Sequence, residues 1–301
     1  MQRIDYLGAD RFSALGDTPV LVVDAASWTK PASPLQAVVV GIDREGSLPS
    51  TDRQAFDVLL TTFDAAPKPW ISIDQAQFDD TVQRLAEMVH ANPVAATIGA
   101  QVLRLSSGLS LPEALQVESF AYSTLLGGAE FRRWQDASKR GTSTPVPADP
   151  VLVLRDGNKI TMQLNDPDNR NAMSAVMRDA LYEALANILD DPSKPNLTLE
   201  GGGKCFSTGG SLPEFGTAND LAEEHVARTL HSCATALDAL GEQATVRLHG
   251  ACIGSGIEVA AAAHRRIASP DAWFQLPELG MGLIPGAGGT ATVARAIGRH
   301  R

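Results

Sequence analysis

The stretch IGSGIEVAAAAHRRIASPDAWFQLPELGMGLIPGAGGT, residues 253–290, places two glutamates, Glu258 and Glu278, in mostly apolar surroundings. Each glutamate follows a break marked by glycine or proline, and 20 positions separate the two. Glycines permit a close approach of the backbone, and a helix that begins at such a turn directs free N–H groups outward. The stretch therefore predicts a site where backbone donors and two carboxylates meet.

The segments around this stretch alternate between strand and helix. Residues 151–164 (VLVLRDGNKITMQL) are typical of two strands joined at an Asp-Gly-Asn turn, and apolar residues recur at helical spacing over 172–190. Residues 196–200 (NLTLE) predict a buried strand, residues 219–240 a second helix, and residues 245–253 (TVRLHGACI) a strand that ends in a glycine turn. This alternation indicates an α/β layer in which the loops at the strand ends carry the chemistry.

A segment rich in Ser, Thr and Pro, GTSTPVPADP at 141–150, is typical of a linker and divides the chain nearly in half. Upstream of it, TPVLVVDA, LQAVVVGID and PWISI predict strands, residues 51–64 predict a helix, and residues 75–140 predict further amphipathic helices. We therefore expect an N-terminal α/β region over 1–140, a linker, and a core over 151–301.

The composition excludes several classes of function. The chain has 301 residues and a formal net charge of −10, which argues against nucleic-acid binding because phosphate contacts need clustered Lys and Arg. Its three cysteines, Cys205, Cys233 and Cys252, are too few and too scattered for a disulfide framework or a zinc site, so we expect no metal and a reducing, cytoplasmic location. The sequence shows neither an apolar signal core nor a run of about 18 apolar residues, so we expect no membrane segment.

Two glycine-rich loops can together supply an oxyanion hole. They are GKCFSTGGSL at 203–212 and HGACIGSGIE at 249–258. Two convergent backbone N–H groups stabilise a carbonyl oxygen that gains negative charge. A simpler interpretation is that the glycines only form tight turns, that Glu258 complements the positive end of a helix, and that Glu278 caps the next turn.

Three segments, GKCFSTGGSL, HGACIGSGIEVA and FQLPELGMGLIPGAGGT, resemble in order and spacing three motifs of the crotonase (enoyl-CoA hydratase/isomerase) family, and the resemblance covers residues 151–301. It implies the ClpP/crotonase-like α/β spiral core, which binds an acyl-CoA thioester. By this resemblance the N–H groups of Gly210 and Ser255 form the oxyanion hole, and Glu258 and Glu278 occupy the two acid/base positions of the hydratase branch. It also implies a homo-oligomer, trimer or hexamer, and no cofactor besides the coenzyme A of the substrate.

Some positions depart from the family pattern. Ser255 stands where a glycine is usual, so its side chain is expected to crowd the oxyanion hole, and Ser211 stands where an Asp is common. Family members continue past the third motif into helices that cover the acyl pocket, and residues 75–140 resemble that tail although they precede the core. We expect them to pack on the core and to cover the acyl end with apolar side chains, among them Phe120, Leu125, Phe131 and Trp134.

The leading reaction is hydration of a 2-enoyl-CoA or the reverse dehydration. A conjugated thioester held by two N–H donors becomes electrophilic at Cβ, so one carboxylate can activate water while the other protonates Cα. Lys204 and Arg170 are candidates to bind the phosphates of coenzyme A, with a solvated surface role as the alternative. Isomerisation, thioester hydrolysis and C–C cleavage need the same oxyanion hole and stay open. From another class of function, a non-catalytic crotonase-like partner subunit also fits.

Overall fold

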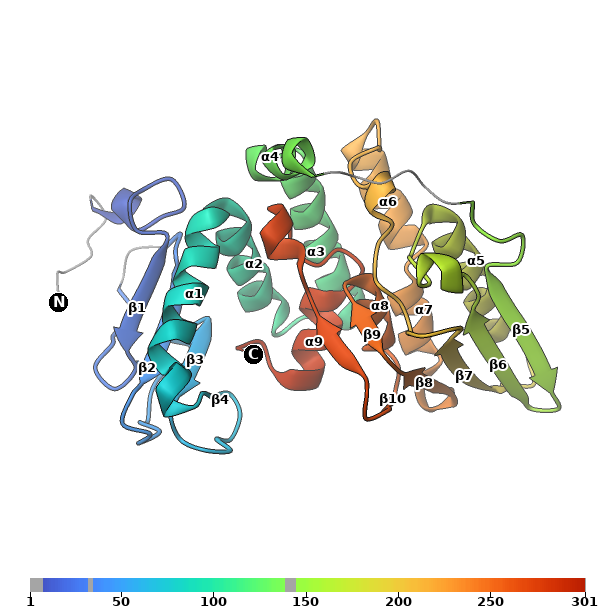
Figure 1. The fold of residues 1–301 in the computed structure, drawn as a ribbon, viewed down its shortest axis with the longest axis horizontal. Helices are drawn as coiled ribbons and strands as arrows, with labels where there is room; N and C mark the ends of the chain where they lie inside the picture. The colour runs from blue at the N-terminus through green and yellow to red at the C-terminus, as the bar shows by residue number, and fades with distance from the viewer. Residues whose placement is uncertain (1–7, 32–34, 139–144, 301) are drawn as a thin grey trace.

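The computed structural model describes residues 8–31, 35–138 and 145–300 (Figure 1). A four-stranded sheet from the N-terminal half and a five-stranded sheet from the second half lie at opposite ends of the molecule, with helices between them (Figure 1). In these three ranges, none of the helices combines the length and the apolar character that crossing a membrane requires. The chain has an α/β fold, as the sequence predicts.

The strands form three sheets. The first sheet is parallel throughout, in the order β1-β2-β3-β4. The second has the order β10-β8-β7-β6-β5 and is parallel except for β5, which pairs antiparallel with β6, and a third pairs β11 with β9. Their bounds are β1 (Val20–Asp24), β2 (Val38–Asp43), β3 (Val58–Thr61), β4 (Ile71–Ser72), β5 (Val151–Asp156), β6 (Lys159–Leu164), β7 (Asn196–Gly201), β8 (Ala244–Leu248), β9 (Ala251–Ile253), β10 (Arg265–Ala268) and β11 (Trp273–Gln275).

The helices lie between and on the sheets. A capping box starts the central helix α3, since Ser110 and Glu113 each accept the other's backbone N–H. The α-helices are α1 (Phe78–Ala91), α2 (Pro93–Ser106), α3 (Leu111–Leu126), α4 (Ala129–Ala137), α5 (Ala175–Leu189), α6 (Leu221–Leu230), α7 (Cys233–Ala239), α8 (Ser255–Ala260) and α9 (Gly289–Ile297). A short 3-10 helix, η7 (Glu278–Met281), follows β11.

The core of the second half lies between its sheet and the helices α5 and α7. Leu181 and Leu185 of α5 pack with Leu237 of α7 against Met162 and Val246 of the sheet, and all five are at most 1% exposed. Burying one such side chain contributes about 1.5–3 kcal/mol to folding. This rigid layer fixes the ends of β7 and β8, from which the two glycine-rich loops emerge.

The predicted elements of the second half largely agree with the structure. The hairpin predicted over 151–164 is confirmed, and the helix predicted over 172–190 is α5. In the N-terminal half, the helix predicted over 51–64 is wrong, because this segment contains a short 3-10 turn followed by the strand β3. A short apolar run cannot be assigned to a buried strand or to a helix from its periodicity alone. Here β3 pairs with β2 on one side and with β4 on the other, and this pairing makes the segment a strand.

The single helix predicted over 219–240 is also wrong, because the segment forms two helices, α6 and α7. His231 has φ −103° and ψ 43°, outside the helical region, and ends α6. The hydroxyl of Ser232 then accepts the N–H of Thr235 at 3.2 Å and caps the start of α7. Serine competes for backbone donors in this way, which explains why an apolar pattern that continues through it does not give one helix.

The helices of residues 75–140 pack against the second half of the same chain. The side-chain amide of Asn92 donates to the carbonyl of Leu279 at 2.8 Å, which ties the start of α2 to η7. A cluster of buried apolar residues joins α2, α3 and α4 to the segment before α9, and its members are Ala95, Val102, Leu125, Leu126, Phe131, Leu283 and Ile284. The predicted domain bounds remain a prediction, and residues 139–144, in and before the linker, lie outside the described residues.

The apolar residues predicted to cover the core divide into two groups. Leu125 and Phe131 are buried, and Trp134 packs partly buried beside them. Phe120 does not cover the core, because it is 59% exposed and its ring stacks on His225 with centroids 4.0 Å apart. Residues five positions apart on a helix, such as Phe120 and Leu125, lie on different faces, so only one of them can face the core.

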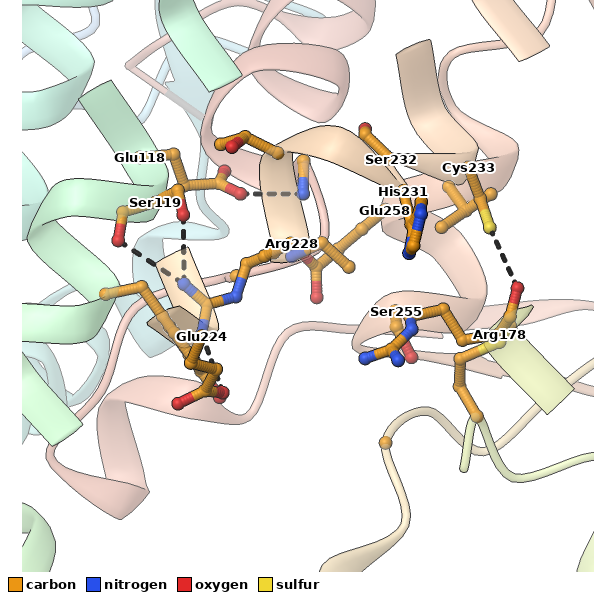
Figure 2. Close-up of a pocket in the computed structure, with 18 of the residues that line it drawn as sticks. Glu118, Ser119, Arg178, Glu224, Arg228, His231, Ser232, Cys233, Ser255 and Glu258 are labelled. Carbon is orange, nitrogen blue, oxygen red and sulfur yellow. Dashed lines mark hydrogen bonds and ion pairs between the residues drawn. The ribbon is translucent and has the colours of Figure 1, made fainter. Parts of the chain in front are cut away.

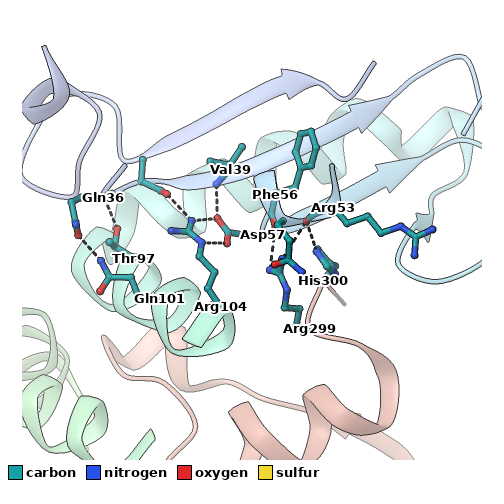
Figure 3. Close-up of polar contacts among 12 residues, drawn as sticks. Gln36, Val39, Arg53, Phe56, Asp57, Thr97, Gln101, Arg104, Arg299 and His300 are labelled. Atoms are coloured by element: carbon teal, nitrogen blue, oxygen red, sulfur yellow. Dashed lines mark hydrogen bonds and ion pairs between the residues drawn. The ribbon is translucent and has the colours of Figure 1, made fainter. Parts of the chain in front are cut away.

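The end of the described chain lies between the two sheets and contacts the N-terminal half (Figures 1 and 3). Nη1 of Arg299 donates to the carbonyl of Phe56 at 3.2 Å. Next to it, the buried carboxylate of Asp57 accepts the N–H of Val39 at 2.8 Å and Nε–H of Arg104 at 2.7 Å, and so joins α2 to the first sheet (Figure 3). The N-terminal sheet, α2 and the chain end are thus held by one polar network.

Candidate active site

The loop after β7 contains the first predicted oxyanion donor. Gly209 has φ +87°, a conformation that residues with a Cβ rarely adopt, and its carbonyl accepts the N–H of Met173 at 2.7 Å. The N–H of Gly209 donates to the hydroxyl of Ser207 at 3.1 Å. Among the described residues, no acceptor is recorded for the N–H of Gly210. The loop therefore presents one backbone donor at the end of the sheet.

The turn between β9 and α8 contains the second predicted donor. Gly254 has φ +49° and precedes the helix, and its carbonyl accepts the N–H of Glu258 at 2.9 Å. Ser255 is the first helical residue, so its N–H has no acceptor within the helix. A Cβ on Gly254 would lie 3.8 Å from the Cα of Gly209, which shows that the two loops touch. The N–H groups of Gly210 and Ser255 follow these two glycines directly.

Both predicted acid/base glutamates converge on Gly254. Glu258 lies in α8 and is 2% exposed, and Glu278 begins η7 and is 7% exposed. A Cβ on Gly254 would stand 2.8 Å from Oε1 of Glu278 and 3.9 Å from Oε1 of Glu258. Any side chain at position 254 would therefore collide with one carboxylate, and the glycine gives both of them access to the space beside Ser255.

The carboxylate of Glu258 is held by the loop before α9. Its Oε2 accepts the N–H of Ala287 at 2.7 Å and the N–H of Gly289 at 3.0 Å. Burial raises the pKa of Glu258 to about 6, although the backbone donors act in the opposite direction. Glu258 is thus mainly ionised at neutral pH, which suits a general base. Gly289 is required here, since a Cβ at this position would lie 2.8 Å from Cγ of Glu258.

Glu278 has a different environment. Its Oε2 is buried and has no hydrogen-bond partner among the described residues. Burial, and then repulsion from Glu258, raise the pKa of Glu278 to about 8. The protonated form therefore predominates at neutral pH and can give up a proton. Two neighbouring glutamates with separated pKa values are the arrangement that acid/base chemistry on one substrate requires.

A third buried glutamate, Glu118 in α3, lies outside the motifs from which the site was predicted. It is 1% exposed and accepts the N–H of Gly288 at 2.7 Å and the N–H and hydroxyl of Thr290 at 2.7 and 2.6 Å. Burial, and then repulsion from Glu258, raise its pKa to about 8. Its place on the apolar stripe of α3, three residues after Leu115, was the available signal, because an acid on a buried face needs a partner.

One cavity of about 630 Å³ joins these groups (Figure 2). Glu258 lies near its centre, with Arg228 and Glu224 of α6 on one side and His231 on the other (Figure 2). Arg228 forms an ion pair of 2.7 Å with Glu224, and its guanidinium stacks 4.6 Å above the ring of Tyr122. The cavity wall thus combines α3 of the N-terminal half with α6 of the second half.

The structure brings together four of the six predicted site residues. The cavity is lined by Gly210, Ser255, Glu258 and Glu278. The hydroxyl of Ser255 is buried and has no partner among the described residues, so the side chain is accommodated beside the free N–H groups. Lys204 and Arg170 are exposed and do not line the cavity, although the carbonyl of Arg170 accepts the N–H of Thr208 in the first loop at 3.1 Å.

Residues 156–301 match the enoyl-CoA hydratase/isomerase family. A Mycobacterium tuberculosis protein named "Probable enoyl-CoA hydratase EchA14" is 34% identical over 151 residues, which are 50% of this chain and 59% of that protein. The 2,3-dehydroadipyl-CoA hydratase of Escherichia coli is 29% identical over 153 residues, which are 50% of this chain and 58% of that protein. The chain thus spans less than two thirds of the length of these relatives.

Solved structures include similar proteins. An enoyl-CoA hydratase from Thermoplasma volcanium aligns with a TM-score of 0.46 and 27% identity, over 50% of this chain and 61% of that one. AtuE of Pseudomonas aeruginosa aligns with a TM-score of 0.45 and 31% identity, over 50% of this chain and 58% of that one. The family match and the sequence relatives agree on the same half of the chain. Residues 156–301 are therefore a domain of the enoyl-CoA hydratase/isomerase, or crotonase, family.

Proposed function

We propose that the protein is an enoyl-CoA hydratase-like lyase, which adds water to a 2-enoyl-CoA thioester or catalyses the reverse dehydration. The observation that carries this proposal is the convergence of Glu258 and Glu278 on Gly254, next to the N–H of Ser255, which has no acceptor within its helix. One carboxyl is mainly ionised and the other mainly protonated at neutral pH, because burial raises their pKa values to about 6 and about 8. The pair is suited to move one proton off water and another onto carbon.

The proposed reaction assigns one role to each group. The N–H groups of Gly210 and Ser255 donate to the thioester oxygen as it gains negative charge. Glu258 takes a proton from water as the water oxygen bonds to Cβ, the Cα–Cβ π bond opens, and Glu278 gives its proton to Cα. The net change is one water added across the double bond, and exchange with solvent restores the two carboxyls. The reaction uses no cofactor beyond the coenzyme A of the substrate.

A spectroscopic assay tests this proposal. Mixing the protein with 2-enoyl-CoA esters of increasing acyl length should bleach the absorbance of the conjugated thioester. The same experiment with the saturated acyl-CoA measures binding without chemistry. Binding without bleaching for every ester would contradict the hydratase proposal and favour one of the alternatives below.

The alternative reactions are isomerisation, thioester hydrolysis and C–C cleavage, all of which use an oxyanion hole. Product analysis after incubation separates them, since only hydrolysis releases free thiol and only cleavage shortens the carbon chain. A non-catalytic partner subunit is the alternative from another class, and the side chain of Ser255 inside the site is the observation that favours it. A protein that neither binds nor converts CoA thioesters would support that alternative.

Three further assignments belong to this proposal. Lys204 and Arg170 bind the phosphates of coenzyme A outside the cavity, where both are exposed. The protein forms a homo-oligomer, trimer or hexamer, which the half-exposed Trp273 and Phe274 of β11 support and light scattering would test. It acts in the cytoplasm, where its three free cysteines stay reduced.

A further inference from the structure

The loop at the start of α9, from Ala287 to Thr290, whose last two residues belong to the helix, is held between two carboxylates from different halves of the chain. Glu258 of α8 accepts the N–H groups of Ala287 and Gly289. Glu118 of α3 accepts the N–H groups of Gly288 and Thr290. Four consecutive N–H groups thus alternate between the two glutamates, so neither set of bonds can shift without the other.

Both oxygens of Glu118 are engaged in this loop. Oε1 accepts from Gly288, and Oε2 accepts from the backbone and the hydroxyl of Thr290, at distances between 2.6 and 2.7 Å. With three donors on two oxygens and 1% exposure, Glu118 has little capacity left to bind a substrate. Its effect on the chemistry is therefore exerted on Glu258, through the loop or through charge repulsion.

The other bonds that hold the loop come from its own helix, since the carbonyl of Gly288 accepts the N–H groups of Ala291 and Thr292 and the hydroxyl of Thr292. Gly288 has φ +121°, and a Cβ on Gly286 would lie 2.6 Å from the ring of Tyr122, so the backbone passes close to α3, and its glycines have no side chains to pack there. Glycine-rich backbone is flexible unless its N–H groups are bound. The bonds to Glu118 supply that restraint on the α3 side, as the bonds to Glu258 do on the α8 side.

We propose that Glu118 is a positioning residue for the reaction, which fixes the N–H groups of Ala287 and Gly289 on Glu258 and thereby sets the orientation and proton affinity of the general base. The part of this inference that concerns turnover rests on the proposed hydratase function. The part that concerns Glu258 does not. The helix that the N-terminal half places beside the core is then a component of the catalytic apparatus as well as a cover.

The test replaces Glu118 by Gln. The amide presents one oxygen and one NH₂ group to two backbone donors, so one donor is repelled and the loop loosens. Since misplacement of a catalytic group by about 1 Å costs on the order of 10²-fold, kcat on a 2-enoyl-CoA should fall by about 10²-fold while KM changes little. The pKa of Glu258, followed by NMR of ¹³C-labelled glutamate carboxyls, should rise, because the backbone donors that lower it are lost.

The direction in which the pKa of Glu258 changes shows whether Glu118 acts by positioning the backbone donors or by its charge. The ionisable groups that line the cavity with Glu258 include Glu118 and Tyr122 of α3, Arg178 of α5, Glu278 of η7, Arg228 and Glu224 of α6, and His231 at the end of α6. Glu118 repels Glu258 only to the extent that it is ionised, so a pure charge effect of Glu118→Gln can lower the pKa of Glu258 but cannot raise it. A fall in that pKa, or unchanged kcat and pKa in a folded variant, would overturn the proposal.

Two further variants make the test decisive. Asp43→Asn is the matched control, because Asp43 is also buried and also accepts two backbone N–H groups and hydroxyls, but in the N-terminal half, away from the cavity. It should lower the melting temperature and leave kcat and the pKa of Glu258 unchanged. Thr290→Val removes one donor to Glu118 and should give smaller changes in the same directions, should Glu118→Gln fail to fold. If the wild type shows no hydratase activity, the titration alone still decides whether Glu118 positions Glu258.

Discussion

The loops after β2 and after β7 contain the same four residues, Gly-Ser-Leu-Pro, at 46–49 and 210–213, yet they end in opposite states. After β2, the carboxylate of Asp43 accepts the N–H of Ser47 at 3.1 Å and the N–H of Leu48 at 2.8 Å. After β7, among the residues that the structure describes, no carboxylate occupies the corresponding place and the N–H of Gly210 has no acceptor. One loop is closed by its own side chain, and the other is open to a ligand.

Two buried carboxyl groups beside these loops, Asp43 and Glu278, differ in the same sense. Burial alone acts to raise the pKa of Asp43, but the donors of Leu48, Thr61 and Ser47 outweigh it and lower that pKa. Glu278 has a buried oxygen without a hydrogen-bond partner in the part of the chain that the structure describes, and its pKa rises to about 8. A parallel strand that ends in a glycine loop is thus not a site by itself. It becomes one where donors and acids are left without partners inside the protein.

The largest expected effect comes from removing the whole N-terminal half, which contains the closed loop after β2. A fragment of residues 145–301 lacks Glu118 and exposes the apolar surface around Leu283 and Ile284 that α2, α3 and α4 cover. It should aggregate or bind acyl-CoA poorly, which sedimentation and calorimetric titration would measure. A soluble and fully active fragment would show that residues 145–301 form a complete site without the N-terminal half.

The second-largest expected effect comes from replacing the two proposed acid/base glutamates of the second half. Glu258→Gln and Glu278→Gln keep the shape of each side chain and remove the proton acceptor or donor, so each should lower kcat by roughly 10²–10⁴-fold. Asp43→Asn should instead destabilise the fold by about 1–3 kcal/mol and leave kcat unchanged. Thermal melts and enoyl-CoA kinetics on all three variants check this contrast. Full activity of both Gln variants would remove the basis for the proposed mechanism.

A third prediction concerns the free backbone donor. Gly210→Pro deletes its N–H and should lower kcat by about 10²-fold or more, provided that circular dichroism shows a folded protein. A Cβ at this position would lie 2.6 Å from the ring of Phe215, so combining the change with Phe215→Ala separates a steric effect from the loss of the donor. If the double variant regained full activity, the N–H of Gly210 would not be an oxyanion donor.

The pH dependence should reflect the two separated glutamates. In the hydration direction, kcat/KM should fall below pH about 6 as Glu258 becomes protonated and above pH about 8 as Glu278 loses its proton. Each limb should change the rate by about tenfold per pH unit beyond its pKa. Glu278→Gln should abolish the alkaline limb in the remaining activity. An alkaline limb that persisted in this variant would assign it to another group.

The smallest expected effect is that of Ser255→Gly. The proposed donor is the backbone N–H, which this change retains, and the change removes a hydroxyl that has no partner among the described residues, so activity should stay the same or increase. Steady-state kinetics on the folded variant measure the effect. Loss of turnover would mean that the hydroxyl takes part in the reaction, so that the loop after β9 contributes a side-chain donor as well as a backbone donor.

Part of the site could be predicted from the sequence because it is local. Gly210, Ser255, Glu258 and Glu278 lie in contiguous motifs whose glycines fix the backbone within a few residues, and all four line the cavity. Glu118 could not be identified in this way, because its partner Gly288 is 170 positions away and only tertiary packing brings them together.

The elements of the fold, too, could be predicted only where local patterns determine them. The amphipathic helix α5 and the hairpin of β5 and β6 follow from periodicity and a turn, which are local properties. β3 does not, because a short apolar run becomes a strand only when neighbours pair with it on both sides. The break between α6 and α7 depends on Ser232 capping a new helix, a competition between two local hydrogen-bond patterns that hydrophobic spacing does not register.

The order of the two halves has a consequence for synthesis. Chains emerge from the ribosome N-terminus first, so α2, α3 and α4 are made before every residue of the core they cover. The last 20 residues of this sequence contain their apolar partners Leu283 and Ile284. The same segment contains the N–H groups that donate hydrogen bonds to the buried carboxyl of Glu118. During translation, α2, α3 and α4 are therefore present with an exposed apolar face and with Glu118 unpaired. Because burying an unpaired acid is costly, Glu118 disfavours burial of that face before the loop at Ala287–Thr290 has been made.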